Sequence, residues 1–162
     1  GYAVWTSDGT RPGTFLLKTF PPNPELPQYS RTHHMIGVGD RLFFAVDERV
    51  LWTSSGHTTA VEPSIDFVAQ TGQRIWGLYP LRDGALVRGE SAYFFTDGTV
   101  ANTVELLDVG DATTSSSVAP IPLANGLLFF LYLPDTGWEP WFTDGTPAGT
   151  RILEVAPGAA GM

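Results

Sequence analysis

Short apolar runs rich in β-branched and aromatic residues alternate with polar turns along the whole chain. Three of these runs have the length and composition of strands: MIGV (35–38), IWGLYPL (75–81) and VAPIPL (118–123). Each is followed by a pair of residues typical of a tight hairpin, namely Gly39-Asp40, Asp83-Gly84 or Asn125-Gly126. Such pairs favour type I′ turns, in which both central residues need φ > 0. The pattern therefore predicts three β-hairpins.

Each predicted hairpin continues into two further strands. The second strands of the hairpins are RLFFAV, ALVRG and LLFFLYL, and a polar link then leads to the aromatic strands RVLWTS, SAYFFT and EPWFT. Another turn leads to a fourth strand, for example TVELLDV or TRILEVA, whereas the first 20 residues contain only an aromatic strand and TFLLKTF. The segment VEPSIDFVAQ (61–70) could form a short helix, but its place in the register predicts a strand.

The same blocks of sequence recur at one period, which identifies an internal repeat. The aromatic residue before the last turn marks four copies at spacings of 47, 42 and 47 residues: Trp5, Trp52, Phe94 and Trp141. The units cover residues 1–20, 34–70, 75–109 and 118–156, and the first of them is a half unit. We label the strands of a full unit A to D in chain order.

Four antiparallel strands in about 45 residues, repeated, are typical of a β-propeller blade. The sequence therefore predicts one all-β domain over residues 1–162, with about three and a half blades. Closed propellers typically have four to eight blades. We therefore expect the chain to be part of a larger propeller, with the remaining blades on a second polypeptide. Other all-β solenoids have similar periods and stay open as the structural alternative.

The repeat resembles the ELWxxDGT repeat of secreted and surface proteins from myxobacteria and related bacteria. The matching stretches are WTSDGTRPGTFLLKTF (5–20) and PWFTDGTPAGTRILEVAPG (140–158), and the resemblance extends over the whole chain. The second unit departs from the pattern, with Ser55 for the Asp and His57 for the Thr. The resemblance implies an extracellular or cell-surface location and a propeller-like fold, but it implies no particular activity.

The repeated DGT block fits a structural turn. An Asp there can accept hydrogen bonds from the backbone amides one and two residues on, the Gly supplies φ > 0, and the Thr hydroxyl can bridge the loop. A serine can replace the Asp more weakly. The predicted turn residues are Asp8, Gly9, Thr10, Ser55, Gly56, Asp97, Gly98, Thr99, Asp144, Gly145 and Thr146.

Composition and charge exclude several classes of function. The net charge of −8 argues against nucleic acid as a partner, and no apolar run is long enough to insert into a membrane. The chain has no cysteine, so thiolate chemistry is excluded. Each DGT loop offers one carboxylate, whereas calcium takes about six to eight oxygen ligands. His33 and His34 are adjacent and would face opposite ways on a strand. We therefore predict no metal, no cofactor and no catalytic residue.

Binding residues are expected on the loops that vary between units. In an up-and-down sheet, the A–B and C–D connections lie at one end and the B–C and D–A connections at the other. The second group covers residues 20–34, 68–74, 109–117 and 133–139. Irregular loops on a rigid scaffold commonly carry binding sites, with exposed aromatic residues and Arg as anchors. The candidates are Tyr29, Arg31, His34, Arg49, Arg74 and Trp138.

These features favour a binding or interaction scaffold that recognises a protein, peptide or carbohydrate ligand. A propeller enzyme, such as a hydrolase or lyase, would need polar residues where the A strands start. Those starts, Met35, Ile75 and Val118, are apolar, which counts against an enzyme unless the remaining blades carry the chemistry. A structural or accessory subunit of an assembly is the second alternative. An apolar, partner-shaped surface in place of a polar pocket would favour it.

Overall fold

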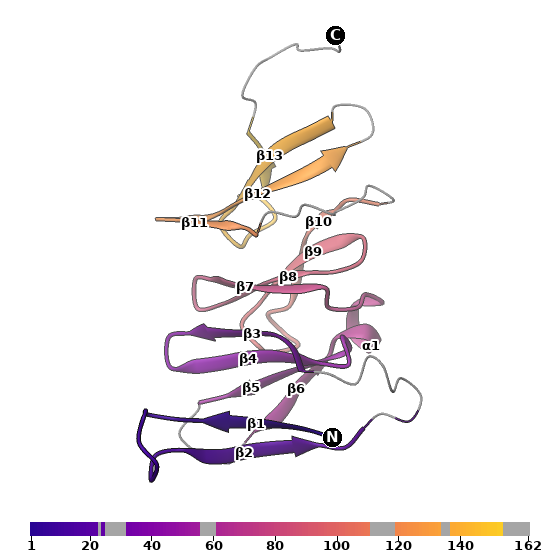
Figure 1. Cartoon of the computed structure of the whole chain (residues 1–162). Helices are drawn as coiled ribbons and strands as arrows, with labels where there is room; N and C mark the ends of the chain where they lie inside the picture. Colours follow the sequence, from indigo (N-terminus) through magenta and orange to yellow (C-terminus); the bar gives the residue numbers. More distant parts are fainter. Residues whose placement is uncertain (23, 25–31, 56–60, 111–118, 134–136, 154–162) are drawn as a thin grey trace.

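The computed structural model of the chain describes residues 1–22, 24, 32–55, 61–110, 119–133 and 137–153. Among these residues are fourteen strands and one short helix, arranged as four antiparallel sheets stacked on one another (Figure 1). The first sheet pairs β1 (Tyr2–Thr6) with β2 (Phe15–Phe20). The second contains β3 (Thr32–Val38), β4 (Arg41–Val46), β5 (Val50–Ser54) and β6 (Glu62–Asp66).

The third sheet contains β7 (Gly77–Leu81), β8 (Gly84–Arg88), β9 (Ala92–Thr96) and β10 (Val104–Asp108). The fourth contains β11 (Ile121–Leu123), β12 (Gly126–Leu133), β13 (Gly137–Thr143) and β14 (Arg151–Ile152). In each sheet the strands pair in chain order, so each full sheet is an up-and-down meander. The all-β class and the division into one two-stranded and three four-stranded antiparallel sheets are confirmed.

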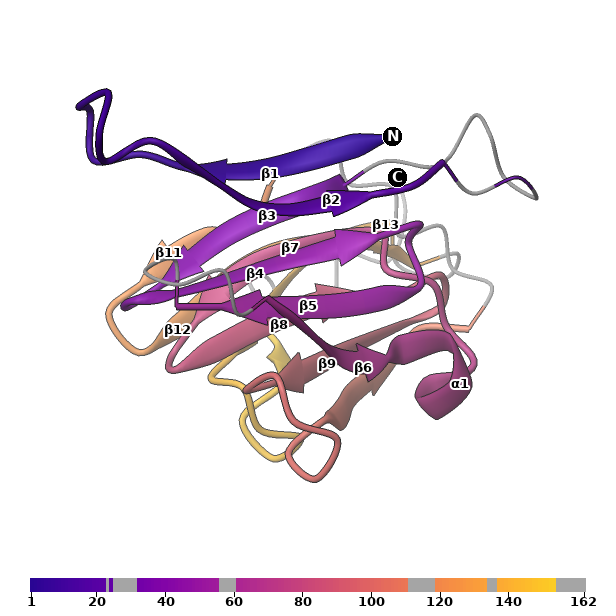
Figure 2. The same ribbon diagram turned by 90° about the horizontal axis from the view of Figure 1, so that it is seen from below.

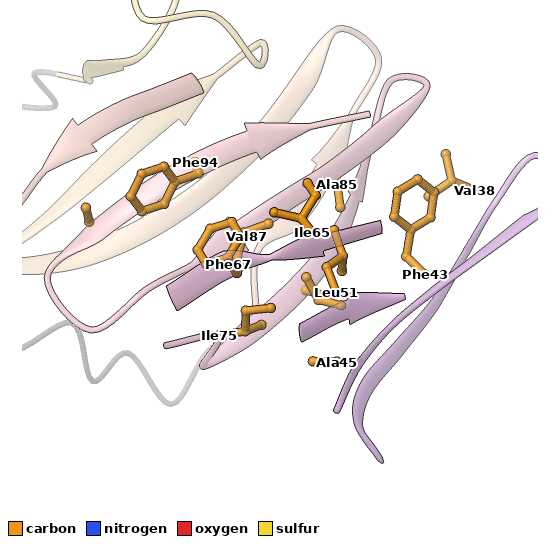
Figure 3. Packing of buried hydrophobic residues seen from close by; sticks show 12 residues of the cluster. Val38, Phe43, Ala45, Leu51, Ile65, Phe67, Ile75, Ala85, Val87 and Phe94 are labelled. Carbon is orange, nitrogen blue, oxygen red and sulfur yellow. The ribbon is translucent and has the colours of Figure 1, made fainter. Parts of the chain in front are cut away.

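The apolar core lies between the sheets, so neighbouring residues on one strand pack in opposite directions. Phe43 belongs to the core between the second and third sheets, and Phe44 to the core between the first and second. Figure 3 shows the first of these cores, where Phe67 meets Phe94 at a ring-centroid distance of 5.2 Å. We call the side of a sheet that faces the preceding sheet its N-side, and the opposite side its C-side. Because both sides are covered, the strand RLFFAV is apolar on both sides at every position after Arg41.

The hairpin turns differ from the sequence prediction. The cross-strand pairs Leu81–Gly84 and Leu123–Gly126 place Gly84 and Gly126 in the strands, so Arg82-Asp83 and Ala124-Asn125 form the turns. A Cβ on Gly84 would overlap the carbonyl oxygen of Thr96, and one on Gly126 would overlap that of Thr143. These glycines therefore serve close approach to the neighbouring strand, and the prediction of type I′ turns at these pairs is wrong.

The first hairpin and the B–C turn of the second sheet complete this correction. Gly39 has a φ of 60°, but Asp40 is not in the left-handed region, so this pair is not a type I′ turn either. Left-handed φ angles at two consecutive residues occur instead at Asp47 and Glu48, with values of 55° and 56°. The amide of Arg49 donates to the carbonyl of Val46 at 3.1 Å and closes that turn.

The segment 61–70 is only partly a strand, so the prediction of strand throughout is wrong. β6 ends at Asp66, and α1 (Phe67–Thr71) follows. The Asp66 carboxylate accepts a hydrogen bond from the amide of Ala69 and caps the helix, and Gly72 ends it. Phe67 is fully buried against the third sheet. The cap and this burial outweigh the strand pattern of the repeat.

Candidate functional site

Up-and-down pairing separates the connections into two groups at opposite ends of the strands. The β1–β2 loop and the β3–β4 and β7–β8 turns lie on one side of the stack, and α1 lies on the other (Figures 1 and 2). We call the side with the A–B and C–D connections the turn face. The side with the B–C and D–A connections is the variable face.

Three DGT loops on the turn face have the same hydrogen bonds. The carboxylates of Asp8, Asp97 and Asp144 accept from the backbone amide of the Thr two residues on, at 2.8, 2.8 and 2.9 Å, and from its hydroxyl at 2.7 Å. The amide of the intervening glycine donates to the hydroxyl that precedes the Asp, which belongs to Ser7, Thr96 or Thr143. The Thr hydroxyl then accepts from an amide three residues on, that of Gly13, Asn102 or Gly149.

These hydrogen bonds stabilise the ionised carboxylates. The Thr10 hydroxyl lowers the pKa of Asp8, and the Thr146 hydroxyl does the same for the pKa of Asp144. Burial acts to raise the pKa of Asp97, but hydrogen bonds from Thr99 and Asn102 outweigh it and the pKa is lowered. In each loop Oδ1 of the carboxylate accepts two hydrogen bonds from the Thr, and in Asp97 Oδ2 also accepts one from Asn102, so these carboxylates hold their loops. In the second unit Ser55 is exposed, and Gly56 lies outside the described residues.

Two arginines contact the DGT loop of the following sheet at the turn face. Arg41 donates from Nη1 to the carbonyl oxygen of Asp97 at 2.8 Å, and its guanidinium lies 4.7 Å from the Phe43 ring centroid. Arg82 lies 5.5 Å from the Phe95 ring centroid and contributes to the lowered pKa of Asp144. Sequence reasoning missed both arginines. The sequence did contain a signal for them, because in two consecutive units an Arg stands next to the Asp of the A–B turn.

Two shallow cavities lie on the turn face, both beside Arg82. One has a volume of about 430 Å³ and is lined by residues 80–82, 122–127 and Asp144. The other has a volume of about 310 Å³ and is lined by residues 38–41, Arg82, Asp83 and Asp97. Both are formed largely by the A–B turns, and their arginines already act on DGT-loop residues, Arg41 on Asp97 and Arg82 on Asp144.

The candidate residues that the structure describes are spread over the variable face. His34 is exposed at a bulge in β3 with a φ of 51°, and Arg74 is exposed between α1 and β7. Trp138 is exposed on β13, and its ring packs edge-on against Tyr132 at 5.7 Å. Each belongs to a different segment of the stack. Tyr29 and Arg31 lie outside the described residues.

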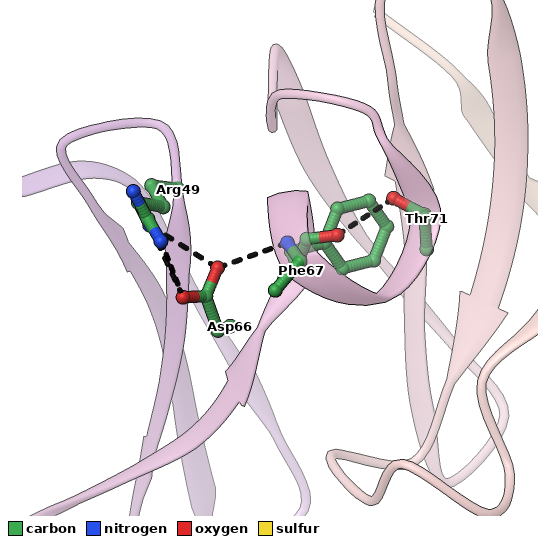
Figure 4. Close-up of polar contacts among 5 residues, drawn as sticks. Arg49, Asp66, Phe67 and Thr71 are labelled. Carbon is green, nitrogen blue, oxygen red and sulfur yellow. Dashed lines mark hydrogen bonds and ion pairs between the residues drawn. The ribbon is translucent and has the colours of Figure 1, made fainter.

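Arg49, the remaining candidate, is engaged within the chain. Its guanidinium binds Asp66 through two nitrogens, with the shortest contact, from Nη2 to Oδ2, at 2.7 Å (Figure 4). The arginine lowers the pKa of Asp66, and the amide of Ala69 adds to this effect. The carbonyl of Arg49 also accepts from the amide of Phe67 at 2.9 Å. Arg49 therefore joins the B–C turn to the start of α1, and its side chain remains more than half exposed on the variable face.

Among the residues that the structure describes, no group of three or more His, Cys, Asp or Glu side chains could hold a metal ion. Within the same ranges, no helix has the length and apolar character needed to cross a membrane. Comparison with protein-family models, curated proteins and solved structures finds no match to this chain. The resemblance to the ELWxxDGT repeat stays a prediction that rests on the repeated residues.

Proposed function

We propose that this chain is an extracellular or surface interaction scaffold of the β-propeller type. Its stack of sheets binds a second polypeptide that carries further sheets of the same kind, and its variable face recognises a ligand. The observation that carries the proposal is that both end sheets expose apolar side chains at positions that the inner sheets bury.

The aromatic residue of strand C shows this most directly. Trp52, Phe94 and Trp141 all lie on the N-side of their sheets and pack in the core shared with the preceding sheet. Phe94 is 3% exposed, whereas Trp5, at the equivalent position in the first sheet, is 59% exposed. Its cross-strand neighbour Leu16 is exposed beside it. A further sheet on the N-side of β1 and β2 would cover both side chains, as the second sheet covers Phe94.

The C-side of the fourth sheet is apolar over all of its first three strands. On β12, Leu127, Phe129 and Leu131 face inward and are buried, so the alternate residues face outward. With their cross-strand partners they form one continuous surface. It contains Ile121, Leu123, Leu128, Phe130, Tyr132, Trp138, Pro140 and Phe142. Contiguous exposed apolar surfaces of this kind mark interaction sites.

The propeller type is supported by the arrangement of the first strands. β3 and β7, the A strands of the second and third sheets, lie beside each other. In a propeller, A strands converge on the central axis while the outer strands spread apart. The resemblance of the repeat supports the extracellular location, and the exposed Arg74 and Trp138 support ligand recognition at the variable face.

Site-specific cross-linking tests the scaffold proposal. A photoreactive phenylalanine analogue would replace Trp5 in one variant and Val100 in the other, because Val100 is 55% exposed on a DGT loop away from both end faces. Cross-linking would be carried out in cells that produce the chain, followed by peptide mass spectrometry of the adducts. We expect only the variant labelled at position 5 to cross-link to a polypeptide whose peptides contain the aromatic–DGT repeat. Equal labelling at both positions, or adducts only with unrelated proteins, would refute the proposal.

A further inference from the structure

The two end faces of the stack differ in kind: one is an N-side and the other is a C-side. Every internal core joins the C-side of one sheet to the N-side of the next. The first sheet exposes an N-side, with Trp5 and Leu16, and the fourth sheet exposes a C-side, with Leu123 and Trp138 on it and Leu128 half-buried between them. The exposed faces are therefore of the two kinds that already pack together three times within the chain.

The equivalence holds residue by residue. Phe43 of the second sheet and Leu86 of the third are the third residues of their B strands, and both are buried on C-sides. Leu128 is the equivalent residue of β12 and lies on the uncovered C-side. On N-sides, Phe44, Val87 and Phe129 form the matching set, and each is buried against the preceding sheet. The end of the fourth sheet therefore presents the same kind of surface that the second sheet presents to the third.

From this continuity we infer that the C-side of the fourth sheet binds the N-side of the first sheet in a second copy of this chain. The inference rests on the proposed scaffold and names one partner for it. Trp5 of one copy would pack on the outer face of β13 and β14 in the other, as Trp52 packs against Phe20 at 5.0 Å within the chain. Such a contact is heterologous, so it closes into a ring where the rotation between copies allows, and otherwise each added copy exposes a new end face. In either case the copies are arranged head to tail.

A cation at the C-side of the fourth sheet agrees with this arrangement. Arg151 on β14 is the cross-strand neighbour of Phe142 on β13, and its guanidinium lies 5.5 Å from the ring centroid. In the internal core between the first and second sheets, Lys18 on the D strand of the first sheet lies 4.8 Å from the ring centroid of Trp52 in the second, and it also donates to the carbonyl of Val61. A cation over an aromatic ring at the rim of a sheet contact is thus already present inside the stack.

A mixing experiment with two one-sided variants tests head-to-tail binding. Trp5→Glu places a charge on the N-side face, and Phe142→Glu places one on the C-side face beside Arg151. Val100→Glu, on a DGT loop, is the matched control. Sedimentation velocity from about 1 to about 200 μM would follow the assembly of each protein and of an equimolar mixture of the two face variants. Circular dichroism would establish that each variant folds, and Leu123→Glu replaces Phe142→Glu if the latter does not.

We expect the wild-type chain and Val100→Glu to form species that grow with concentration. Each face variant alone is expected to associate at least about tenfold more weakly. Their mixture is expected to form a one-to-one dimer, because each variant keeps the face that the other has lost, and to grow no further. If the wild-type chain dimerises and only one of the two variants abolishes the dimer, the same face of both copies forms the contact. Such symmetric pairing would overturn the inference. A wild-type chain that stays monomeric would overturn it as well. If the repeat-bearing adduct at position 5 is still found, the scaffold proposal stands and only the second copy fails.

Discussion

Arg41 and Asp97 join consecutive sheets at the turn face: the guanidinium donates from Nη1 to the carbonyl oxygen of Asp97 at 2.8 Å. The arginine is the first residue of β4, directly after the A–B turn of the second sheet, and the aspartate belongs to the DGT loop of the third. The same guanidinium lies over Phe43, whose ring is part of the core between these sheets. One side chain therefore connects a surface loop, a neighbouring turn and the core below them.

Removing this connection is expected to weaken the contact between the two sheets. We expect Arg41→Ala to lower the free energy of unfolding by about 1–2 kcal/mol, because a hydrogen bond from a charged donor and packing on Phe43 are both lost. Arg41→Lys keeps the charge but loses the planar guanidinium, so its loss should be smaller. Urea unfolding followed by tryptophan fluorescence measures both. Equal stability of Arg41→Ala and wild type would show that the contact contributes nothing.

Gly9 and Gly98 form a matched pair for separating loop strain from packing between sheets. Their φ angles are 89° and 91°, so alanine is strained at either position. A Cβ at Gly9 would meet nothing within 4 Å, whereas one at Gly98 would approach Arg41 Nη2 at 2.8 Å and Thr53 Cγ2 at 3.0 Å. We expect Gly98→Ala to cost about 1–3 kcal/mol more than Gly9→Ala in thermal or urea unfolding. Indistinguishable costs would mean that loop strain is the whole effect.

The DGT carboxylates predict a loss of stability in acid. The pKa values of Asp97 and Asp144 are lowered by folding, so each stabilises the folded state above the unfolded pKa, and this stabilisation is lost as the pH falls through the folded value. We expect the free energy of unfolding to be nearly constant above about pH 5 and to fall below about pH 4. Replacing both residues by Asn should flatten this dependence while lowering stability at neutral pH. Parallel pH profiles for wild type and the double variant would contradict the assignment.

Trp5 and Phe94 occupy equivalent positions but should respond very differently to truncation. Phe94 is buried in the core between the second and third sheets, so Phe94→Ala is expected to cost about 3–5 kcal/mol. Trp5→Ala at an exposed position should change stability by less than about 0.5 kcal/mol in dilute solution. Urea unfolding at low protein concentration measures both. A large loss for Trp5→Ala there would mean that its side chain already has an intramolecular role.

The local features of this protein could be predicted from residues that act on their neighbours. Asp97 and Thr99 form their loop through hydrogen bonds between positions two apart, so the DGT pattern was sufficient to place the turn. The helix at Phe67–Thr71 was missed because its cap at Asp66 and the burial of Phe67 compete with a strand register that the other units obey. Arg49 was predicted as a binding residue from its place in a variable loop, and its ion pair with Asp66, 17 positions away, could not be found from sequence alone.

The all-β class, the strands, their grouping into units and the DGT loops can all be derived from the sequence. They follow from apolar runs, turn residues and hydrogen bonds over a few positions. Three properties emerge only from the packing of the sheets: Gly84 and Gly126 lie against a neighbouring carbonyl, Arg41 reaches the loop of the next sheet, and Trp5 is exposed where Phe94 is buried. These properties depend on which sheet packs against which. Equivalent residues of a repeat have nearly the same local sequence, and they differ in the neighbours that the stack gives them.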